Sequence, residues 1–167
     1  MTCSQCGYDY ESLARPQLTQ ALGEETAGVL TEFFSVGELH ARPDPEVWSA
    51  LEYACHVRDV LEVQRHRVKL AQSEDVPAFA PMGRDERVAS LSYATQDPDC
   101  VAADLAANAH SLMETLEDLS TDGWRRTGIY NYPVPAERSV EWIIRNTIHE
   151  LVHHRQDIRS VGAGRRP

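Results

Sequence analysis

Apolar side chains along this chain recur mainly at intervals of three and four residues, which is the spacing of one face of an α-helix. The pattern predicts four long helices, over about residues 17–34, 44–72, 97–119 and 139–160, and a short irregular helix over about 85–93. No clear alternation of apolar and polar residues indicates strands, although a short extended piece could lie within 127–134. The sequence therefore predicts an all-α protein.

Capping residues mark where two of these helices begin. Asp44, Pro45 and Glu46 offer an N-cap, a first-turn proline and an acidic residue in the favoured order, which predicts that the second helix starts here. Ser139 is the expected N-cap of the fourth helix. A linker rich in proline, alanine and glycine, 76–84, follows the second helix. Four amphipathic helices joined in this way most simply pack as a four-helix bundle.

Length and charge limit the class of protein. The 167 residues suit one domain with a single core, and we expect an N-terminal extension over 1–12, the bundle over 13–162 and a basic tail over 163–167. Asp and Glu number 26 against 16 Lys and Arg, a formal net charge of -10, so no nucleic-acid partner is expected. No apolar run approaches the roughly 18 residues of a membrane span, and no signal-like segment opens the chain. We therefore expect a soluble cytoplasmic protein without a membrane partner.

The cysteines at positions 3, 6, 55 and 100 are too few for a disulfide framework and favour a reducing compartment. Cys3 and Cys6 form a CxxC pair that looks like half of a zinc ribbon or knuckle. No second CxxC and no nearby CxxH completes it, so a locally ordered turn is the favoured interpretation. A redox or dimer-bridging role for the pair stays open.

The segment 149–153 reads His-Glu-Leu-Val-His and carries the strongest chemical signal. Its two imidazoles, His149 and His153, are at i and i+4 of a predicted helix and are close enough to share a metal ion. The segment matches the HExxH motif of zinc metalloproteases, but the fourteen residues after His153 contain neither a further glutamate nor the glycine-histidine continuation of that class. A third ligand must then come from upstream. His154 points about 100° away from His153 and could replace it if the helix were rotated.

His56 on the second predicted helix is the best candidate for the third ligand, because it shares a stripe with Glu52 and Asp59 beside the apolar face. With His149 and His153 it would give three imidazoles from two helices and an open coordination position, as in catalytic metal sites. This donor set suits zinc, nickel, cobalt or ferrous iron. A lone helical histidine is more often a surface or core residue, so the residues alone leave the role of His56 open.

Two carboxylates lie near this predicted site. Asp59, one turn after His56, could orient an imidazole or approach the metal itself. Glu150 is adjacent to His149 in sequence but is displaced around the helix, so a role for it is less expected.

Residues 48–60 and 142–158 resemble the DinB/YfiT-like metalloprotein superfamily. In that family a tryptophan-led helix carries one metal-binding histidine followed by an aspartate three residues later, and the last helix carries two further histidines at i and i+4. The matching residues are Trp48, His56, Asp59, His149 and His153. The resemblance implies an up-down-down-up four-helix bundle with a long connection after the second helix, frequently assembled as a homodimer.

Several members of that family look like transferases for low-molecular-weight thiols, including mycothiol and bacillithiol. The resemblance therefore implies a divalent metal ion, zinc or nickel, that activates such a thiol for attack on an electrophilic small molecule. The expected metal ligands are His56, His149 and His153. Asp59 is the expected catalytic residue, acting by orienting an imidazole. The expected contacts of the thiol cosubstrate or the substrate are Arg58, Tyr130 and Asn131.

Two other functions stay open. The protein could be a non-catalytic, stress-associated metal-binding dimer, or a hydrolase in which metal-bound water replaces the thiolate as the nucleophile. Turnover that needs an added thiol would distinguish the transferase from both. The segment 130–132 could equally form a rigid packed loop, and the N-terminal CxxC pair departs from the family pattern.

Overall fold

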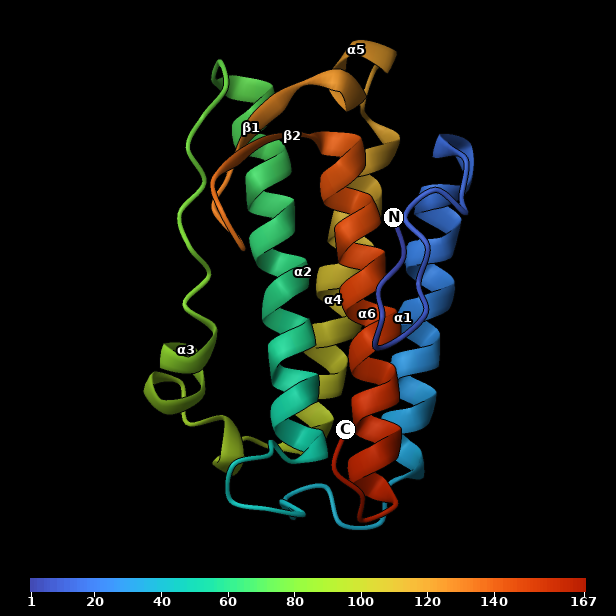
Figure 1. The fold of residues 1–167 in the computed structure, drawn as a ribbon, viewed down its shortest axis with the longest axis vertical. Coiled ribbons are helices and arrows are strands. Elements are labelled where there is room, and N and C mark those ends of the chain that lie inside the picture. The colour runs from blue at the N-terminus through green and yellow to red at the C-terminus, as the bar shows by residue number, and fades with distance from the viewer.

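Residues 1–167 are all described by a computed structural model, in which four long helices form a bundle (Figure 1). These helices are α1 (Leu18–Ser35), α2 (Ala50–Ser73), α4 (Pro98–Glu117) and α6 (Val140–Gly162). α1 and α6 run in one direction, and α2 and α4 run in the other. Both α1 and α2 pack mainly against α4 and α6, so α1 and α2 lie at opposite corners of the bundle. The predicted all-α class and the up-down-down-up topology are confirmed.

The connection after α2 is long and runs back along the outside of the bundle before α4 begins (Figure 1). It contains α3 (Arg84–Ser90) and the 3-10 turn η2 (Tyr93–Thr95), and a further 3-10 turn, η1 (Arg15–Gln17), precedes α1. The short helix predicted over 85–93 corresponds to α3 followed by η2. This return path brings the chain back to the end of the bundle where α2 starts, so α4 runs parallel to α2.

A small hairpin between α4 and α6 closes the other end of the bundle. The short helix α5 (Thr121–Arg125) leads into β1 (Thr127–Tyr130), which pairs antiparallel with β2 (Ala136–Ser139). The N–H of Phe79 donates to the carbonyl oxygen of Ile129 at 3.0 Å, so β1 is also joined to the connection after α2. The extended piece expected within 127–134 is thus a strand, while its partner β2 was not predicted.

The second helix begins later than predicted. Its N-cap is Ser49, whose hydroxyl accepts a hydrogen bond from the N–H of Glu52 at 3.2 Å, while the Glu52 carboxylate accepts one from the N–H of Ser49 at 2.8 Å. Asp44 instead closes a local turn, in which it accepts a hydrogen bond from the N–H of Glu46 at 2.9 Å. The reciprocal capping box satisfies two backbone donors at once, so the start predicted at Asp44 is corrected to Ala50.

Buried apolar side chains from all four long helices form the core. Most buried polar side chains lie on α2 and α6, two neighbouring antiparallel helices: Glu52, His56, Asp59, Gln64, Arg67, Asn146, Thr147, His154 and Asp157. Burying polar groups costs free energy unless they are paired, so this strip marks the part of the core where a functional site is expected. None of the helices combines the length and the apolar composition that a membrane crossing requires.

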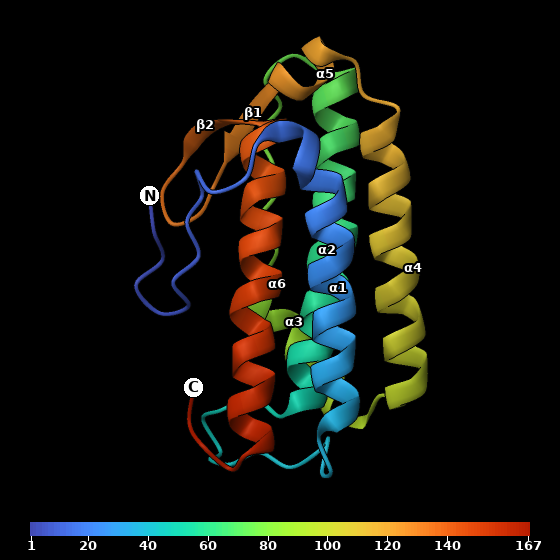
Figure 2. The ribbon, with the colours of Figure 1, turned by 90° about the vertical axis from the view of Figure 1, so that its right-hand side faces the viewer.

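The N-terminal residues 1–12 form a hairpin against the outside of α6 (Figure 2). Thr2 and Asp9 form an antiparallel bridge within it. The guanidinium of Arg145 on α6 donates a hydrogen bond to the carbonyl oxygen of Tyr10 at 2.7 Å. The N-terminal segment is therefore attached to the helix that carries the HExxH motif.

Candidate metal centre

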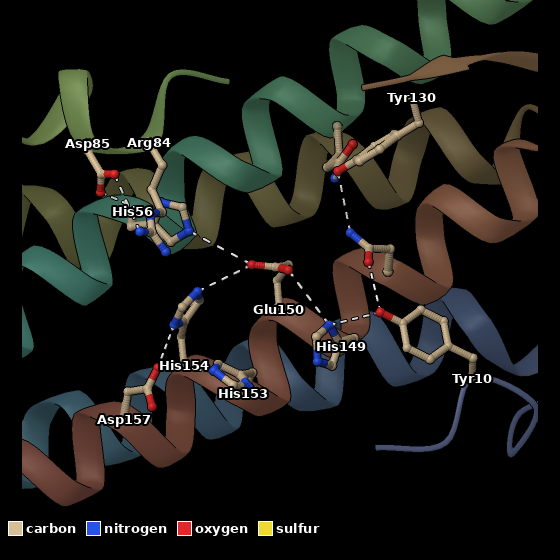
Figure 3. Close-up of polar contacts among 12 residues, drawn as sticks. Tyr10, His56, Arg84, Asp85, Tyr130, His149, Glu150, His153, His154 and Asp157 are labelled. Atoms are coloured by element: carbon tan, nitrogen blue, oxygen red, sulfur yellow. Dashed lines mark hydrogen bonds and ion pairs between the residues drawn. The ribbon is translucent and has the colours of Figure 1, made fainter. Parts of the chain in front are cut away.

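His56 on α2 meets Glu150 and His154 of α6 in the space between the two helices (Figure 3). The ligand atoms of these three residues all lie within 4.8 Å of one another. The Glu150 carboxylate lies between the two rings, with its Oε2 3.9 Å from His56 Nε2 and 3.3 Å from His154 Nε2. Glu150 and His154 are at i and i+4, so α6 projects both from one face. Two imidazoles and one carboxylate thus meet at one point of the core.

Asp157, one turn after His154, fixes the orientation of that ring. Its Oδ2 lies 2.7 Å from His154 Nδ1, which leaves Nε2 facing Glu150. A carboxylate that holds one ring nitrogen while the other faces the site is the usual arrangement around a metal-binding histidine. Aromatic rings pack against both imidazoles of the donor group. The ring centroids of Tyr53 and His154 are 5.5 Å apart, and those of Trp48 and His56 are 5.4 Å apart.

Burial and pairing shift the ionisation of these groups in opposite directions. Burial disfavours the charged form of His154, but its hydrogen bonds with Asp157 and Glu150 outweigh that effect and raise the pKa of His154 to about 9. Burial alone would raise the pKa of Glu150, whereas its contacts with His154 and His56 hold that pKa below its usual range. Burial lowers the pKa of His56. An ionised Glu150 and a neutral His56 are the protonation states that metal ligands require, whereas His154 must release its Nε2 proton to bind an ion.

An open groove of about 720 Å³ reaches this donor group at His154. His153 and His154 line it from α6, while Trp48 and Arg84 line it from the segments before and after α2. The guanidinium carbon of Arg84 lies 5.2 Å from the Trp48 ring centroid. The volume falls in the range of small-molecule sites. A ligand in the groove would therefore meet an aromatic ring, an imidazole of the donor group, and Arg84 in an ion pair with Asp85 at 3.0 Å.

Asp59 holds the connection that carries Arg84. Its Oδ2 accepts hydrogen bonds from the Tyr93 hydroxyl at 2.6 Å and from Arg87 at 3.0 Å, while its Oδ1 accepts one from Arg58 at 2.8 Å. Burial, together with the hydrogen bond to Asp59, raises the pKa of Tyr93 well above its usual value. Because Arg87 lies in α3, which begins at Arg84, these contacts set the position of α3 against α2.

The sequence pattern described as the DinB superfamily matches residues 17–158, which include most of all four long helices. The chain belongs to the DinB superfamily. Among solved structures, YfiT from Bacillus subtilis, described as a probable metal-dependent hydrolase with an unusual four-helix bundle topology, superposes with a TM-score of 0.75 at 19% identity, covering 89% of each chain. A mycothiol-dependent maleylpyruvate isomerase superposes with a TM-score of 0.74 at 15% identity, covering 90% of this chain and 63% of its own. The comparison with curated proteins found no match. At these identities the structural likeness shows a shared fold.

The three histidines predicted as ligands are not brought together in this DinB protein. His56 lies in the donor group between α2 and α6, whereas His149 and His153 project toward the N-terminal hairpin, with His149 Nδ1 3.7 Å from Glu150 Oε1. The residues of α6 that face His56 are each one position further along, Glu150 and His154. The helical period identified an i,i+4 pair of ligands, but it did not show which of two overlapping pairs faces the core.

The carboxylate of Asp59, the predicted orienting residue, is engaged by Arg58, Arg87 and Tyr93 and makes no hydrogen bond to His56. Arg58 also donates to the side-chain oxygen of Gln96 at 2.6 Å. Both residues therefore anchor the connection after α2.

Tyr130 and Asn131, the predicted substrate contacts, pack the β1–β2 hairpin onto the bundle. The buried Tyr130 hydroxyl accepts a hydrogen bond from Gln64 at 3.0 Å, and the guanidinium carbon of Arg67 lies 4.6 Å from the Tyr130 ring centroid. The Asn131 amide donates to the carbonyl oxygen of Phe79. These contacts favour the packed-loop interpretation of the segment.

Sequence reasoning did not select Glu150, His154 or Arg84. A signal for the first two was present, because Glu150 and His154 form a second i,i+4 pair of ligand-type residues within the same six positions. No local signal pointed to Arg84, because its place beside the donors depends on the path of the connection between α2 and α4.

Proposed function

We propose that this DinB protein is an enzyme in which His56, Glu150 and His154 hold a divalent metal ion that activates a low-molecular-weight thiol, such as mycothiol, for attack on an electrophilic small molecule. The convergence of these three donors beside the groove carries the proposal. Two histidines and one carboxylate are a ligand set of catalytic sites, in which at least one coordination position stays open for a reactant.

The donors fit a divalent cation by charge and by chemistry. Glu150 supplies a negative charge between two imidazoles. His56 is almost fully buried, and its Nε2 lies 3.9 Å from Glu150 Oε2, which is longer than a hydrogen bond and leaves room for an ion between them. Nitrogen donors combined with one carboxylate suit zinc, nickel and ferrous iron, of which we propose zinc or nickel.

A divalent ion with an open coordination position lowers the pKa of a bound thiol or water and so supplies a nucleophile near neutral pH. Around it, the chain orients the ligands. Asp157 keeps the Nδ1 of His154 hydrogen-bonded, so that its Nε2 faces the site. Trp48 and Tyr53 cover the two imidazoles.

Arg84 lies at the groove in an exposed ion pair with Asp85, and we propose that an anionic group of the thiol or the electrophile takes the place of that carboxylate. We propose Asp59 as a positioning residue rather than a catalytic one, because it acts through Arg87 to hold α3, where Arg84 begins the helix. Loss of Asp59 would therefore change the position of Arg84 without removing a metal ligand.

The size of the groove favours thiol transfer over hydrolysis. Thiol transfer needs room for two organic reactants, and about 720 Å³ next to the donors meets that need. The fold-level likeness to a mycothiol-dependent isomerase supports the same choice, whereas the likeness to YfiT supports hydrolysis as the alternative.

The test is turnover of a chromogenic alkylating electrophile by tag-free protein loaded with zinc or nickel, with and without mycothiol, bacillithiol or glutathione. We expect turnover that depends on a thiol, that falls about 10–100-fold or more in Glu150→Gln and His154→Ala, and that persists in His110→Ala, whose side chain is exposed. Turnover without any thiol would favour the hydrolase. Metal binding without turnover of any electrophile would favour the non-catalytic dimer. Thiol-dependent turnover that is unchanged in both site variants would contradict the proposed site.

A cytoplasmic location and a homodimer complete the proposal. All four cysteines are free, which suits a reducing compartment and a thiol cosubstrate. The dimer rests on the resemblance to the DinB family. Light scattering from the purified protein should give twice the chain mass of 18.7 kDa, and a value of one chain mass would exclude the dimer.

A further inference from the structure

The N-terminal hairpin and α6 bring four metal-binding side chains together outside the site proposed above. The ligand atoms of Cys3, Cys6, His149 and His153 all lie within 4.8 Å of one another. Two thiolates and two imidazoles are a standard donor set of closed zinc sites. We infer that these four residues bind a structural zinc ion that joins the N-terminal hairpin to α6.

The two histidines present buried nitrogen atoms that no protein group satisfies. His149 and His153 are at i and i+4 on one face of α6, and their ring centroids are 5.5 Å apart. Nε2 of His149 and Nδ1 of His153 are both buried and have no hydrogen-bond partner. An unpartnered buried polar atom costs free energy, which ligation of a metal ion would recover.

Contacts on the other side of the rings support these two nitrogens as the ligand atoms. The Tyr10 hydroxyl donates to Asn146 Oδ1 at 2.9 Å and lies 3.0 Å from His149 Nδ1. Because the hydroxyl has one hydrogen, it accepts from the Nδ1–H of His149, and the lone pair of that ring is then on Nε2. In His153, Nε2 is the atom that faces a carboxylate, 3.7 Å from Asp157 Oδ2, which leaves Nδ1 for the metal.

The turn that carries the two cysteines has the form of a zinc knuckle. The N–H of Gly7 donates to the carbonyl oxygen of Cys3 at 3.0 Å, and Gly7 has a φ of 76°, a left-handed conformation that glycine adopts without strain. The N–H of Cys3 also donates to the carbonyl oxygen of Tyr8 at 2.8 Å, so two backbone hydrogen bonds close the turn.

This second site has a structural rather than a catalytic composition. Four protein donors complete a tetrahedral zinc shell and leave no position for a reactant. The missing half of the CxxC site is the histidine pair of α6, far away in the sequence. A bound ion would fix residues 1–12 against α6 beside the turn that carries Glu150. The inference does not depend on the proposed enzyme activity, because the two donor sets share no residue.

Zinc content of the tag-free full chain tests the inference. Inductively coupled plasma mass spectrometry is applied to wild type, Cys3→Ser, Cys6→Ser and the matched control Cys100→Ser, whose thiol is exposed. We expect Cys3→Ser and Cys6→Ser each to lose about one equivalent of zinc and Cys100→Ser to lose none. In wild type, X-ray absorption at the zinc edge should show zinc–sulfur distances of about 2.3 Å. That wild-type spectrum decides the question even where a variant folds poorly.

Two further variants separate this inference from the proposed enzyme site. His56→Ala and His154→Ala should remove the metal between α2 and α6 and leave the sulfur-ligated zinc in place. Zinc without sulfur ligands in wild type would overturn the inference, and so would unchanged zinc content in Cys3→Ser and Cys6→Ser. A disulfide between Cys3 and Cys6 in protein prepared under reducing conditions would also overturn it.

Discussion

At the scale of single residues, a short stretch of α6 carries two overlapping pairs of metal-binding side chains. His149 and His153 form one pair, and Glu150 and His154 form the other. A step of one residue turns a side chain by about 100° around the helix axis, so the two pairs face different neighbours. The first pair faces the N-terminal hairpin, and the second faces His56 on α2. Adjacent residues therefore belong to different donor groups.

The variant Asp157→Asn tests whether the orientation of His154 controls metal binding. Asparagine keeps the size of the side chain but weakens the hydrogen bond to His154 Nδ1, so we expect the metal affinity between α2 and α6 to fall about 10–100-fold. Chelator competition measures this affinity in a Cys3→Ser/Cys6→Ser background, where only that site remains. Glu114→Gln, which changes an exposed acid, is the control. Equal affinities in the two variants would show that Asp157 has no orienting role.

At the scale of elements, a buried carboxylate holds the start of α2. Glu52 is 1% exposed and pairs with Arg42 while it caps the N–H of Ser49. Burial alone would raise the pKa of Glu52, but the contacts with Arg42 and Ser49 outweigh it and hold that pKa below its usual range. A depressed pKa means that the interaction stabilises the fold above the unfolded value of about 4.3, and that this stability is lost as pH falls through the folded pKa.

The variant Arg42→Met leaves the Glu52 carboxylate buried without its cation. We expect the free energy of unfolding to fall by about 1–3 kcal/mol at pH 7. The difference from wild type should shrink below about pH 4, where the carboxylate takes up a proton. Urea unfolding at pH 7 and at a pH below about 4 measures the difference in the free energy of unfolding. Arg125→Met removes an exposed ion pair with Asp122 and should change the value by less than about 0.5 kcal/mol. A loss that is the same at both pH values would contradict the role of the ionised Glu52.

The variant Gly128→Ala tests the close contact between β1 and the connection after α2. A methyl group at Gly128 would collide with the Phe79 ring and would lie 2.9 Å from the carbonyl oxygen of Pro77. We expect a loss of about 1–3 kcal/mol in the free energy of unfolding, measured in urea. Gly37→Ala is the matched control, because nothing lies within 4 Å of its added methyl group. Equal stability of the two variants would contradict the close packing.

The long helices could be predicted from the sequence because each buries one apolar stripe in the bundle. The start of α2 was misplaced because the sequence offers two helix-start signals, Asp44 followed by a proline and the capping box of Ser49 and Glu52, and the chain uses the second. Strand β2 (Ala136–Ser139) has no alternating apolar residues, and it is extended because it pairs with β1. Pairing of this kind depends on tertiary structure, which a short sequence window does not contain.

At the scale of the whole molecule, both donor groups form only where distant segments meet. The residues pointed to the HExxH segment as a candidate metal site, and the DinB resemblance added His56 and implied the bundle that holds them. Which pair on α6 faces α2 depends on the rotation of α6, which buried residues such as Ile144 and Leu151 determine. The approach of Cys3 and Cys6 to α6 depends on the path of the N-terminal hairpin, for which no local pattern exists.

Metal binding should stabilise the whole fold, because each donor group is assembled only in the folded chain. Free zinc at about 100 times the dissociation constant of a site should raise the free energy of unfolding by about 2.7 kcal/mol for that site. Urea unfolding in zinc-buffered solution measures this increase. The variants His56→Ala and Cys3→Ser/Cys6→Ser should each keep part of it, and their combination should abolish it. Stability that is independent of free zinc in wild type would contradict both sites.

Anomalous diffraction at the zinc absorption edge, from crystals of the full chain grown with zinc, is the most direct test of the metal site between α2 and α6. Two peaks are predicted. The first should be bounded by His56, Glu150 and His154, and the second by Cys3, Cys6, His149 and His153. A single peak shared by His56 and the HExxH histidines, or the absence of any peak between α2 and α6, would contradict the assignment.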